Sequence, residues 1–135
     1  RPESSELVIA ADTVVVHGGK IIGKPRSDSE ALAMLQELCG SEHHVATGVA
    51  LAFPDGTHKA FADSCAVRFA PWDEASLRAY VATGECRDKA GAYAIQGQGA
   101  FLVESISGCW STVVGLPIER VTRIFVTGGW LLPAV

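Results

Sequence analysis

The spacing of apolar residues changes along the chain between a strand period and a helix period, and these changes outline the elements. Residues 7–16 are almost continuously apolar and β-branched, which predicts a buried strand. The turn sequence at 17–20, His-Gly-Gly-Lys, then predicts a hairpin into residues 21–22. After it, Ser27 and Glu30 have the spacing of a capping box. They predict a helix that Gly40 ends, with one apolar face made of Ala31, Leu32, Leu35 and Leu38.

The middle of the chain reads as two paired strands followed by a second helix. Residues 43–53 and 57–69 are extended in pattern, and Pro-Asp-Gly at 54–56 separates them, which predicts an antiparallel pair. Asp73 is the expected cap of a short helix that ends at Gly84 and turns Leu77, Tyr80 and Val81 inward.

The last third begins with a glycine-rich segment and returns to the sheet at residues 100–106. Pro117 fits the first turn of a final helix, in which Ile118, Val121 and Phe125 share one face. Residues 115–117 are expected to shape the loop before that helix and to carry no chemistry. Without repeats or a linker, residues 1–135 predict a single α/β domain with a mixed sheet and flanking helices.

Composition and charge narrow the partners. The chain has 135 residues, 48% of them hydrophobic, and a net charge of −4, which argues against a nucleic acid polymer as partner. Its basic residues fall in short, glycine-flanked groups that suit a small anion. The four cysteines form no C-x-x-C pair, so reduced thiols in the cytoplasm are expected, without zinc or disulfides. No apolar run reaches the roughly 18 residues of a membrane span, so no membrane partner is expected.

The glycine-rich segment at residues 88–99 offers the first candidate chemistry. Glycines let backbone N–H groups approach a ligand closely. Lys89 supplies a positive charge suited to phosphate, and Gln96 and Gln98 each offer donors and an acceptor to a base edge. The segment indicates a nucleotide site; a flexible surface loop with a solvated ion pair is the alternative.

Asp12 is a second candidate because it interrupts an apolar strand. Burying a carboxylate is costly unless it is hydrogen-bonded, paired or bound to a metal. A structural carboxylate at a strand bend, a general base and a Mg²⁺ ligand all remain open. Ala10 stands where phosphoaspartate chemistry would need a second carboxylate, which disfavours that route.

Two further groups are weaker candidates. Pro25 stiffens the turn that carries Lys24, so Lys24 either neutralises phosphate or is a solvated turn lysine. His43 and His44 are neighbours on a strand and point to opposite faces, which favours a structural histidine over a metal site.

Taken in order, the motifs resemble those of the Maf family of nucleoside triphosphate pyrophosphatases, which are related in fold to inosine triphosphatases. The resemblance is carried by ADTVV at 11–15, GKP at 23–25, HHVATGVAL at 43–51, DKAGAYAIQG at 88–97 and VVGLP at 113–117. It implies an inosine-triphosphatase-like fold and hydrolysis of a nucleoside triphosphate to the monophosphate and pyrophosphate. It also implies help from Mg²⁺ or Mn²⁺, and the family is often linked to septum formation.

Carried over by position, the resemblance gives individual residues a role. Asp12 corresponds to the proton acceptor at the metal, with Thr13 beside it at a specificity position. Gln96 corresponds to the other specificity position, in the form typical of the branch acting on dTTP and UTP. Lys24 and Lys89 match lysines expected near the phosphates. The resemblance is also compatible with a homodimer.

The chain departs from the family at several points. Ala94 stands where glycine is usual, and Cys109 and Thr112 replace commoner residues ahead of VVGLP; we expect these changes to tune the pocket. The family's first strand and its Ser-x-Ser-Pro-Arg-Arg phosphate loop have no counterpart before Arg1. The chain therefore resembles the C-terminal two-thirds of a Maf protein, and a nucleotide-binding or regulatory module without turnover is the alternative function.

Overall fold

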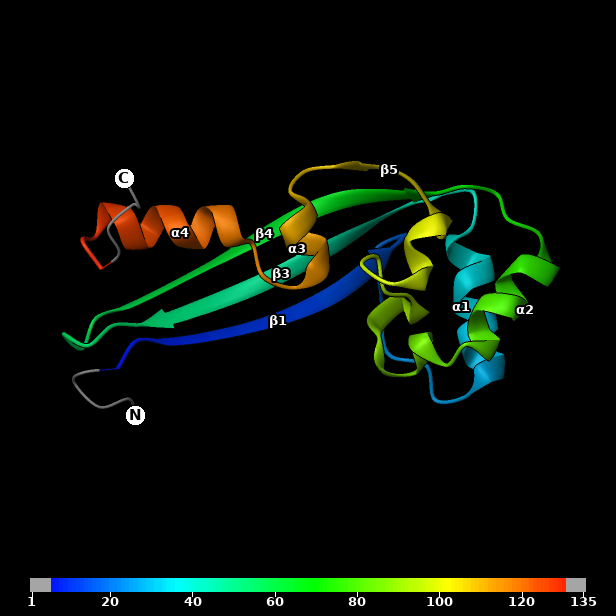
Figure 1. Ribbon diagram of the computed structural model, residues 1–135, viewed down its shortest axis with the longest axis horizontal. Coiled ribbons are helices and arrows are strands. Elements are labelled where there is room, and N and C mark those ends of the chain that lie inside the picture. The colour runs from blue at the N-terminus through cyan, green and yellow to red at the C-terminus, as the bar shows by residue number, and fades with distance from the viewer. Residues whose placement is uncertain (1–5, 131–135) are drawn as a thin grey trace.

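The computed structural model describes residues 6–130, which form one five-stranded sheet with helices packed on it (Figure 1). The sheet order is β2-β1-β3-β4-β5, and every pairing among these strands is antiparallel. The strands are β1 (Val8–His17), β2 (Lys20–Ile22), β3 (Glu42–Ala52), β4 (His58–Phe69) and β5 (Val103–Ser107). The α/β class with flanking helices is as predicted, but the sheet of the described residues is antiparallel where a mixed sheet was expected.

Four α-helices and three short 3-10 helices complete the described part of the chain. The α-helices are α1 (Asp28–Leu38), α2 (Glu74–Ala82), α3 (Trp110–Val114) and α4 (Ile118–Thr127). The 3-10 helices are η1 (Glu85–Asp88), η2 (Ala90–Ala92) and η3 (Gln98–Leu102). Figure 1 shows α1, α2 and the 3-10 helices gathered at one end of the long strands, with α4 toward the other end. None of the helices within residues 6–130 is both long and apolar enough to cross a membrane.

The predicted helix starts are confirmed by their capping bonds. Ser27 Oγ accepts from the backbone N–H of Glu30 at 3.1 Å, and Glu30 reaches back to the N–H of Arg26 at 3.2 Å. Asp73 likewise caps α2 by accepting from the N–H of Ser76 at 2.8 Å. Each cap satisfies a donor that the first helical turn leaves free, which fixes where the helix begins.

The core lies on one face of the sheet. Along β3 the buried residues alternate with exposed or half-buried ones, as a strand with one covered face requires. A larger cluster under α1 and α2 includes Val45, Val67 and Phe69, and a smaller one under α4 is formed around Val49, Leu51, Phe53 and Val121. The pocket described below lies at the edge of the larger cluster.

Three further details of the sequence prediction were wrong. The first residues of β1, Val8 to Asp12, are exposed, because the helical layer covers only the far end of that strand. Residues 98–102 form η3, so β5 begins only at Val103. Ile118 is 57% exposed, since α4 turns Val121 and the half-buried Ile124 and Phe125 toward the sheet instead.

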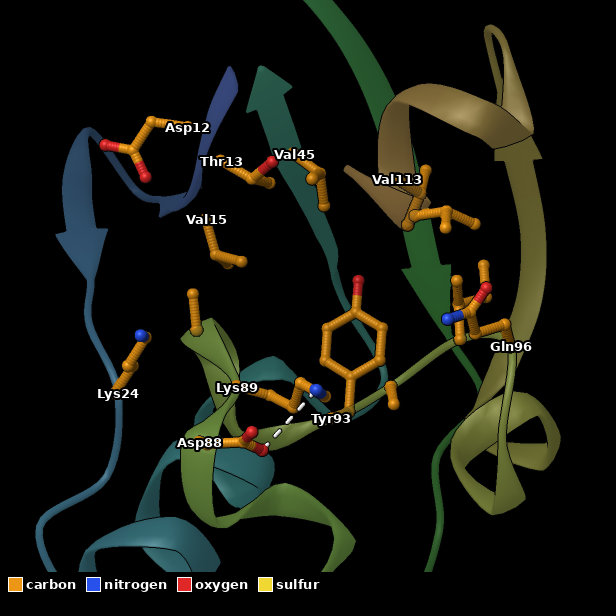
Figure 2. Close-up of a pocket in the computed structure, with 14 residues that line it drawn as sticks. Asp12, Thr13, Val15, Lys24, Val45, Asp88, Lys89, Tyr93, Gln96 and Val113 are labelled. Carbon is orange, nitrogen blue, oxygen red and sulfur yellow. Dashed lines mark ion pairs between the residues drawn. The ribbon is translucent and has the colours of Figure 1, made fainter. Parts of the chain in front are cut away.

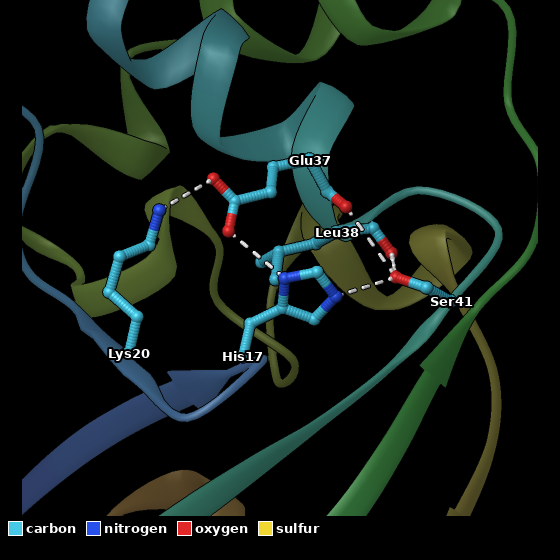
Figure 3. Close-up of polar contacts among 5 residues, drawn as sticks. All are labelled: His17, Lys20, Glu37, Leu38 and Ser41. Carbon is cyan, nitrogen blue, oxygen red and sulfur yellow. Dashed lines mark hydrogen bonds and ion pairs between the residues drawn. The ribbon is translucent and has the colours of Figure 1, made fainter.

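The end of β1 is tied to α1 by a polar cluster (Figure 3). The Glu37 carboxylate accepts from Nδ1 of His17 at 2.9 Å and lies 3.5 Å from Nζ of Lys20. Nε2 of His17 lies 3.1 Å from Oγ of Ser41, which donates to the carbonyl of Leu38 at 2.9 Å. The bond from His17 holds the pKa of the Glu37 carboxyl below its usual range. The cluster locks the hairpin and α1 together on the side where Lys24 leaves the sheet.

Candidate nucleotide site

A pocket of about 270 Å³ opens where the covered end of β1 meets the glycine-rich segment. Its walls come from five separate parts of the sequence: β1, the connection from β2 to α1, β3, the segment 88–96 and α3. The lining residues that carry the argument are Asp12, Thr13, Lys24, Lys89, Tyr93 and Gln96. The five residues to which the resemblance gives a role therefore lie around one cavity, whereas Gln98, also a candidate for the base edge, does not line it.

The polar residues are divided between two sides of the pocket. Figure 2 shows Asp12 and Lys24 on one side and Gln96 on the opposite side, with the ring of Tyr93 between them. Val15 and Val45 add apolar surface between the two sides, and Val113 adds more on the side of Gln96. The pocket thus joins a side that carries Asp12 and Lys24 to a side with a neutral hydrogen-bonding amide, and the Tyr93 ring and the ion pair of Lys89 with Asp88 lie between them.

Asp12 lies in a different environment from the one expected. It pairs with Gly48 across the sheet and is exposed to solvent, so its carboxylate carries no burial cost. The strand period turns Thr13 and Val15 toward the helices, while Asp12 lies at the open rim beyond β1 (Figure 2). An exposed carboxylate at the rim is accessible to water and to cations, and any role for Asp12 follows from that placement.

The two lysines reach the pocket on loops that are joined by their backbones. The N–H of Gly91 donates to the carbonyl of Gly23 at 3.1 Å, which links the turn before Lys24 to the segment after Lys89. Gly91 has a φ of +72°, and a side chain there would press on Val15 at 3.2 Å. Glycine at 91 is therefore needed for both the conformation and the close approach. Lys89 also lies 3.4 Å from Asp88, which holds its ammonium near the pocket floor (Figure 2).

The loop that carries Gln96 is held on both sides by two side chains of the helical layer. Tyr80 accepts from the N–H of Ala94 at 3.1 Å and donates to Glu85 at 2.8 Å. The Glu85 carboxylate accepts from the N–H groups of Gln98 at 2.9 Å and Gly99 at 3.0 Å. We call Tyr80 and Glu85 the loop bracket. It fixes the backbone before and after Gln96 and leaves the amide side chain exposed at the pocket.

The loop bracket also explains two glycines and one pKa. A Cβ at position 97 would overlap the Glu85 carboxylate, and one at Gly99 would lie 2.7 Å from the Tyr80 oxygen. Partial burial alone would raise the pKa of Glu85, but the bonds donated by Gln98, Tyr80 and Gly99 outweigh it and keep the pKa below its usual range. The carboxylate therefore stays charged and accepting at neutral pH.

Beneath the pocket, Tyr93 is bonded to a buried histidine. The Tyr93 hydroxyl lies 2.7 Å from Nε2 of His43, and both rings pack edge to face with Phe69. Burial lowers the pKa of His43 to about 4, so the ring is neutral at physiological pH. His44 is exposed on the other face of β3. The prediction of a structural histidine at 43 is consistent with this contact, and residues 6–130 contain no group of three or more His, Cys, Asp or Glu side chains that could hold a metal.

Three functional contacts were missed in the sequence. The loop bracket has no sequence signature, because Glu85 and Tyr80 act on backbone N–H groups across a turn. The helix α3, which brings Val113 to the pocket, is only five residues long, and the sequence analysis predicted no element there. Thr47 did carry a signal: it is a polar residue on the covered face of β3, between the buried Val45 and Val49. Of the departures noted above, Ala94 lines the pocket, Thr112 is buried behind it, and Cys109 contacts Ser111 at 3.0 Å.

A comparison with known proteins shows the family of the chain. Residues 1–127 match the family described as Maf, Maf-like protein. The chain belongs to the Maf family. It is 50% identical over 125 residues to the dTTP/UTP pyrophosphatase of Nitratidesulfovibrio vulgaris, covering 91% of this chain and 59% of that relative. It is 49% identical over 123 residues to the dTTP/UTP pyrophosphatase of a Geobacillus species, covering 91% and 66%.

A third relative extends the comparison. The dTTP/UTP pyrophosphatase of Alcanivorax borkumensis is 50% identical over 117 residues, covering 87% of this chain and 60% of the relative. The Maf chain described here thus spans about three-fifths to two-thirds of the length of these curated relatives. The family match extends over the whole pocket, because residues 1–127 include β1, β3, the glycine-rich segment and α3.

Proposed function

We propose that this Maf chain provides the pocket of a nucleoside triphosphate pyrophosphatase that converts dTTP or UTP to the monophosphate and pyrophosphate. The observation that carries the proposal is the division of the pocket, with a carboxylate and an ammonium at one end and an amide at the other (Figure 2). The names of the three relatives support the same substrates.

The two lysines are assigned to the phosphates. Lys24 and Lys89 both line the pocket and are exposed enough for their ammonium groups to follow a bound polyphosphate. Positive charge placed in advance where negative charge develops lowers the barrier to attack at phosphorus. The link between Gly91 and Gly23 keeps the two lysine loops at a constant spacing.

Asp12 is assigned to the attacking water. An exposed carboxylate at the rim, on the same side as Lys24, can accept a proton from a water molecule and orient its lone pair toward phosphorus (Figure 2). Asp12→Asn keeps the size of the side chain and removes the base. We expect it to lower kcat for UTP by roughly 10²- to 10⁴-fold in a pyrophosphate-release assay. Unchanged turnover by a folded Asp12→Asn variant would remove Asp12 from the mechanism.

The residues present fit a hard divalent cation such as Mg²⁺ or Mn²⁺. Asp12 supplies an accessible carboxylate at the charged end, and magnesium is commonly bound by one or two carboxylates together with substrate phosphates. When bound, the cation would neutralise phosphate charge and favour ionisation of a coordinated water. Asp12 would hold the cation from the protein side, and Lys24 and Lys89 would share the remaining phosphate charge.

Gln96 is assigned to the base. Its amide offers an acceptor and two donors, and the loop bracket keeps its backbone fixed at the end of the pocket away from Asp12. Gln96→Glu removes the donors and adds a negative charge. We expect it to change the preference among bases more than the affinity for inorganic pyrophosphate; an unaltered base preference would count against contact with the base.

A nucleotide-binding or regulatory module without turnover is the second candidate function. It is favoured by the lining of the pocket, in which Lys24 and Lys89 are the cationic side chains available to a polyphosphate. Metal-dependent release of pyrophosphate from UTP by this chain would exclude it. Nucleotide binding without release would favour it over the pyrophosphatase.

The proposal extends to the cellular location of the protein, its oligomeric state and the process it serves. A cytoplasmic location is supported by the four cysteines, all of which are free. A homodimer and a link to septum formation are implied by family membership and stay predictions. Sedimentation of the purified chain and the division phenotype of a deletion strain would test them.

A further inference from the structure

Behind Thr13, three threonines form a chain of hydrogen bonds that runs from the pocket into the core. Oγ1 of Thr13 lies 2.9 Å from Oγ1 of Thr47, and Oγ1 of Thr47 donates to the carbonyl oxygen of Thr112 at 2.9 Å. Thr112 is in turn anchored by its own hydroxyl, which donates to Asp63 at 2.9 Å. The chain crosses from β1 to β3 and ends on α3.

The direction of each bond in this chain is fixed by counting hydrogens. A carbonyl oxygen can only accept, so the single hydroxyl hydrogen of Thr47 is used on Thr112. Thr47 is fully buried, and no water can reach it to offer an alternative. The bond between Thr13 and Thr47 therefore needs the hydrogen of Thr13. What Thr13 then presents to the pocket is a lone pair, with no hydrogen left to donate.

We propose that Thr47 is a positioning residue for base selection, because it makes the hydroxyl of Thr13 an obligate hydrogen-bond acceptor. The inference rests on the proposed function, since it concerns the base of the nucleotide in that same pocket. The ring of uracil or thymine has a hydrogen at N3, whereas cytosine has a lone pair there. When N3 of the base faces Thr13, the N3–H of uracil or thymine donates to the Thr13 oxygen. Cytosine places the lone pair of its N3 against the lone pair of Thr13, with no hydrogen between them.

Gln96 cannot make this distinction by itself. Its amide can turn over, so that either its oxygen or its NH₂ group faces a given atom of the base. Thr13 has no such freedom while Thr47 holds its hydrogen. Selection between uracil and cytosine therefore depends on a buried hydroxyl that does not line the pocket.

The test compares binding of UMP and CMP by titration calorimetry. The chain should bind UMP more tightly than CMP by roughly ten- to a hundredfold, the cost of facing an unpaired buried group. Thr47→Val should free the hydrogen of Thr13, raise the affinity for CMP and shrink that ratio by about tenfold. Partial unfolding of the variant cannot cause a higher affinity for CMP. If Thr47→Val does not fold, Thr47→Ala takes its place in the same titrations.

Two controls separate positioning from packing. Thr47→Ser keeps the hydroxyl and should keep the UMP preference within about twofold. In a Thr13→Val background, adding Thr47→Val should leave the ratio unchanged, because the group through which Thr47 acts is gone. The inference would be overturned if Thr47→Val still changed the ratio of UMP to CMP affinity in the Thr13→Val background.

The outcomes distinguish this inference from the proposed reaction. Equal binding of UMP and CMP by the unaltered chain, or binding of neither, overturns the inference even if pyrophosphate is released from UTP. A UMP preference that Thr47→Val abolishes supports it even if no pyrophosphate is released, in which case the proposed reaction fails alone.

Discussion

Acidification should destabilise this protein through one buried ring, His43. The side chain is 1% exposed, its Nε2 is bonded to Tyr93, and its Nδ1 has no partner within residues 6–130. A proton added to the ring would place an uncompensated charge between Phe69 and Tyr93. Burial accordingly lowers the pKa of His43 to about 4.

The size and sign of the effect follow from the two pKa values. In the unfolded chain His43 titrates near 6.5, so between about pH 6.5 and pH 4 the unfolded state binds a proton that the folded state does not. The stabilisation is therefore complete above pH 6.5 and is lost as the pH falls toward 4. At pH 5, about 1.5 pH units below the unfolded value, the loss is about 2 kcal/mol.

Urea unfolding at pH 7 and pH 5 measures this loss against a matched variant. His43→Gln cannot titrate but keeps a polar group that can reach the Tyr93 hydroxyl. The unaltered protein should lose about 2 kcal/mol more than His43→Gln between the two pH values, because the other acidic and basic groups contribute equally to both proteins. Equal losses would show that His43 does not resist protonation in the folded state.

Three other changes test the surroundings of the pocket. Gly97→Ala should lower the free energy of unfolding by about 1–3 kcal/mol in thermal melts, because its Cβ overlaps the Glu85 carboxylate; a neutral effect would mean that the loop shifts freely. Glu85→Gln, which weakens both backbone bonds, should raise the KM for UTP several-fold with little change in helix content by circular dichroism, and an unaltered KM would count against the loop bracket. Glu37→Gln should reduce the loss of stability on acidification below about pH 4.5. The pKa of Glu37 is lowered in the folded protein, so the stabilisation by its carboxylate is complete above the ordinary pKa and is lost as the pH falls through the folded-state pKa. An unchanged dependence of stability on pH would contradict this prediction.

Much of the fold could be predicted because the local signals agree with the tertiary structure. The alternation along β3, the caps at Ser27 and Asp73, and the turn between β3 and β4 each correspond to a single physical requirement. The failures occurred where burial depends on distant parts of the chain. The apolar start of β1 predicted a buried strand, but no helix within residues 6–130 covers that end.

The sequence predicted which residues share the candidate pocket, but not how they are arranged in it. Motif order placed Asp12, Thr13, Lys24, Lys89 and Gln96 together, and the structure brings them around one pocket. The sequence did not predict that Asp12 is exposed, because exposure depends on strand register. It did not predict the loop bracket either, because its side chains bond to backbone N–H groups. Such bonds require no particular residue type at the donor position, apart from the exclusion of proline.

The loop bracket has a consequence for how new substrate preferences can arise. It holds the loop through the N–H groups of residues 94, 98 and 99, and every amino acid except proline has that group. The side chain at 96 is therefore uncoupled from the support that positions it. Under the proposed function, a single codon change at position 96 alters the base that is recognised while the scaffold stays intact, so substrate preference can change in one evolutionary step.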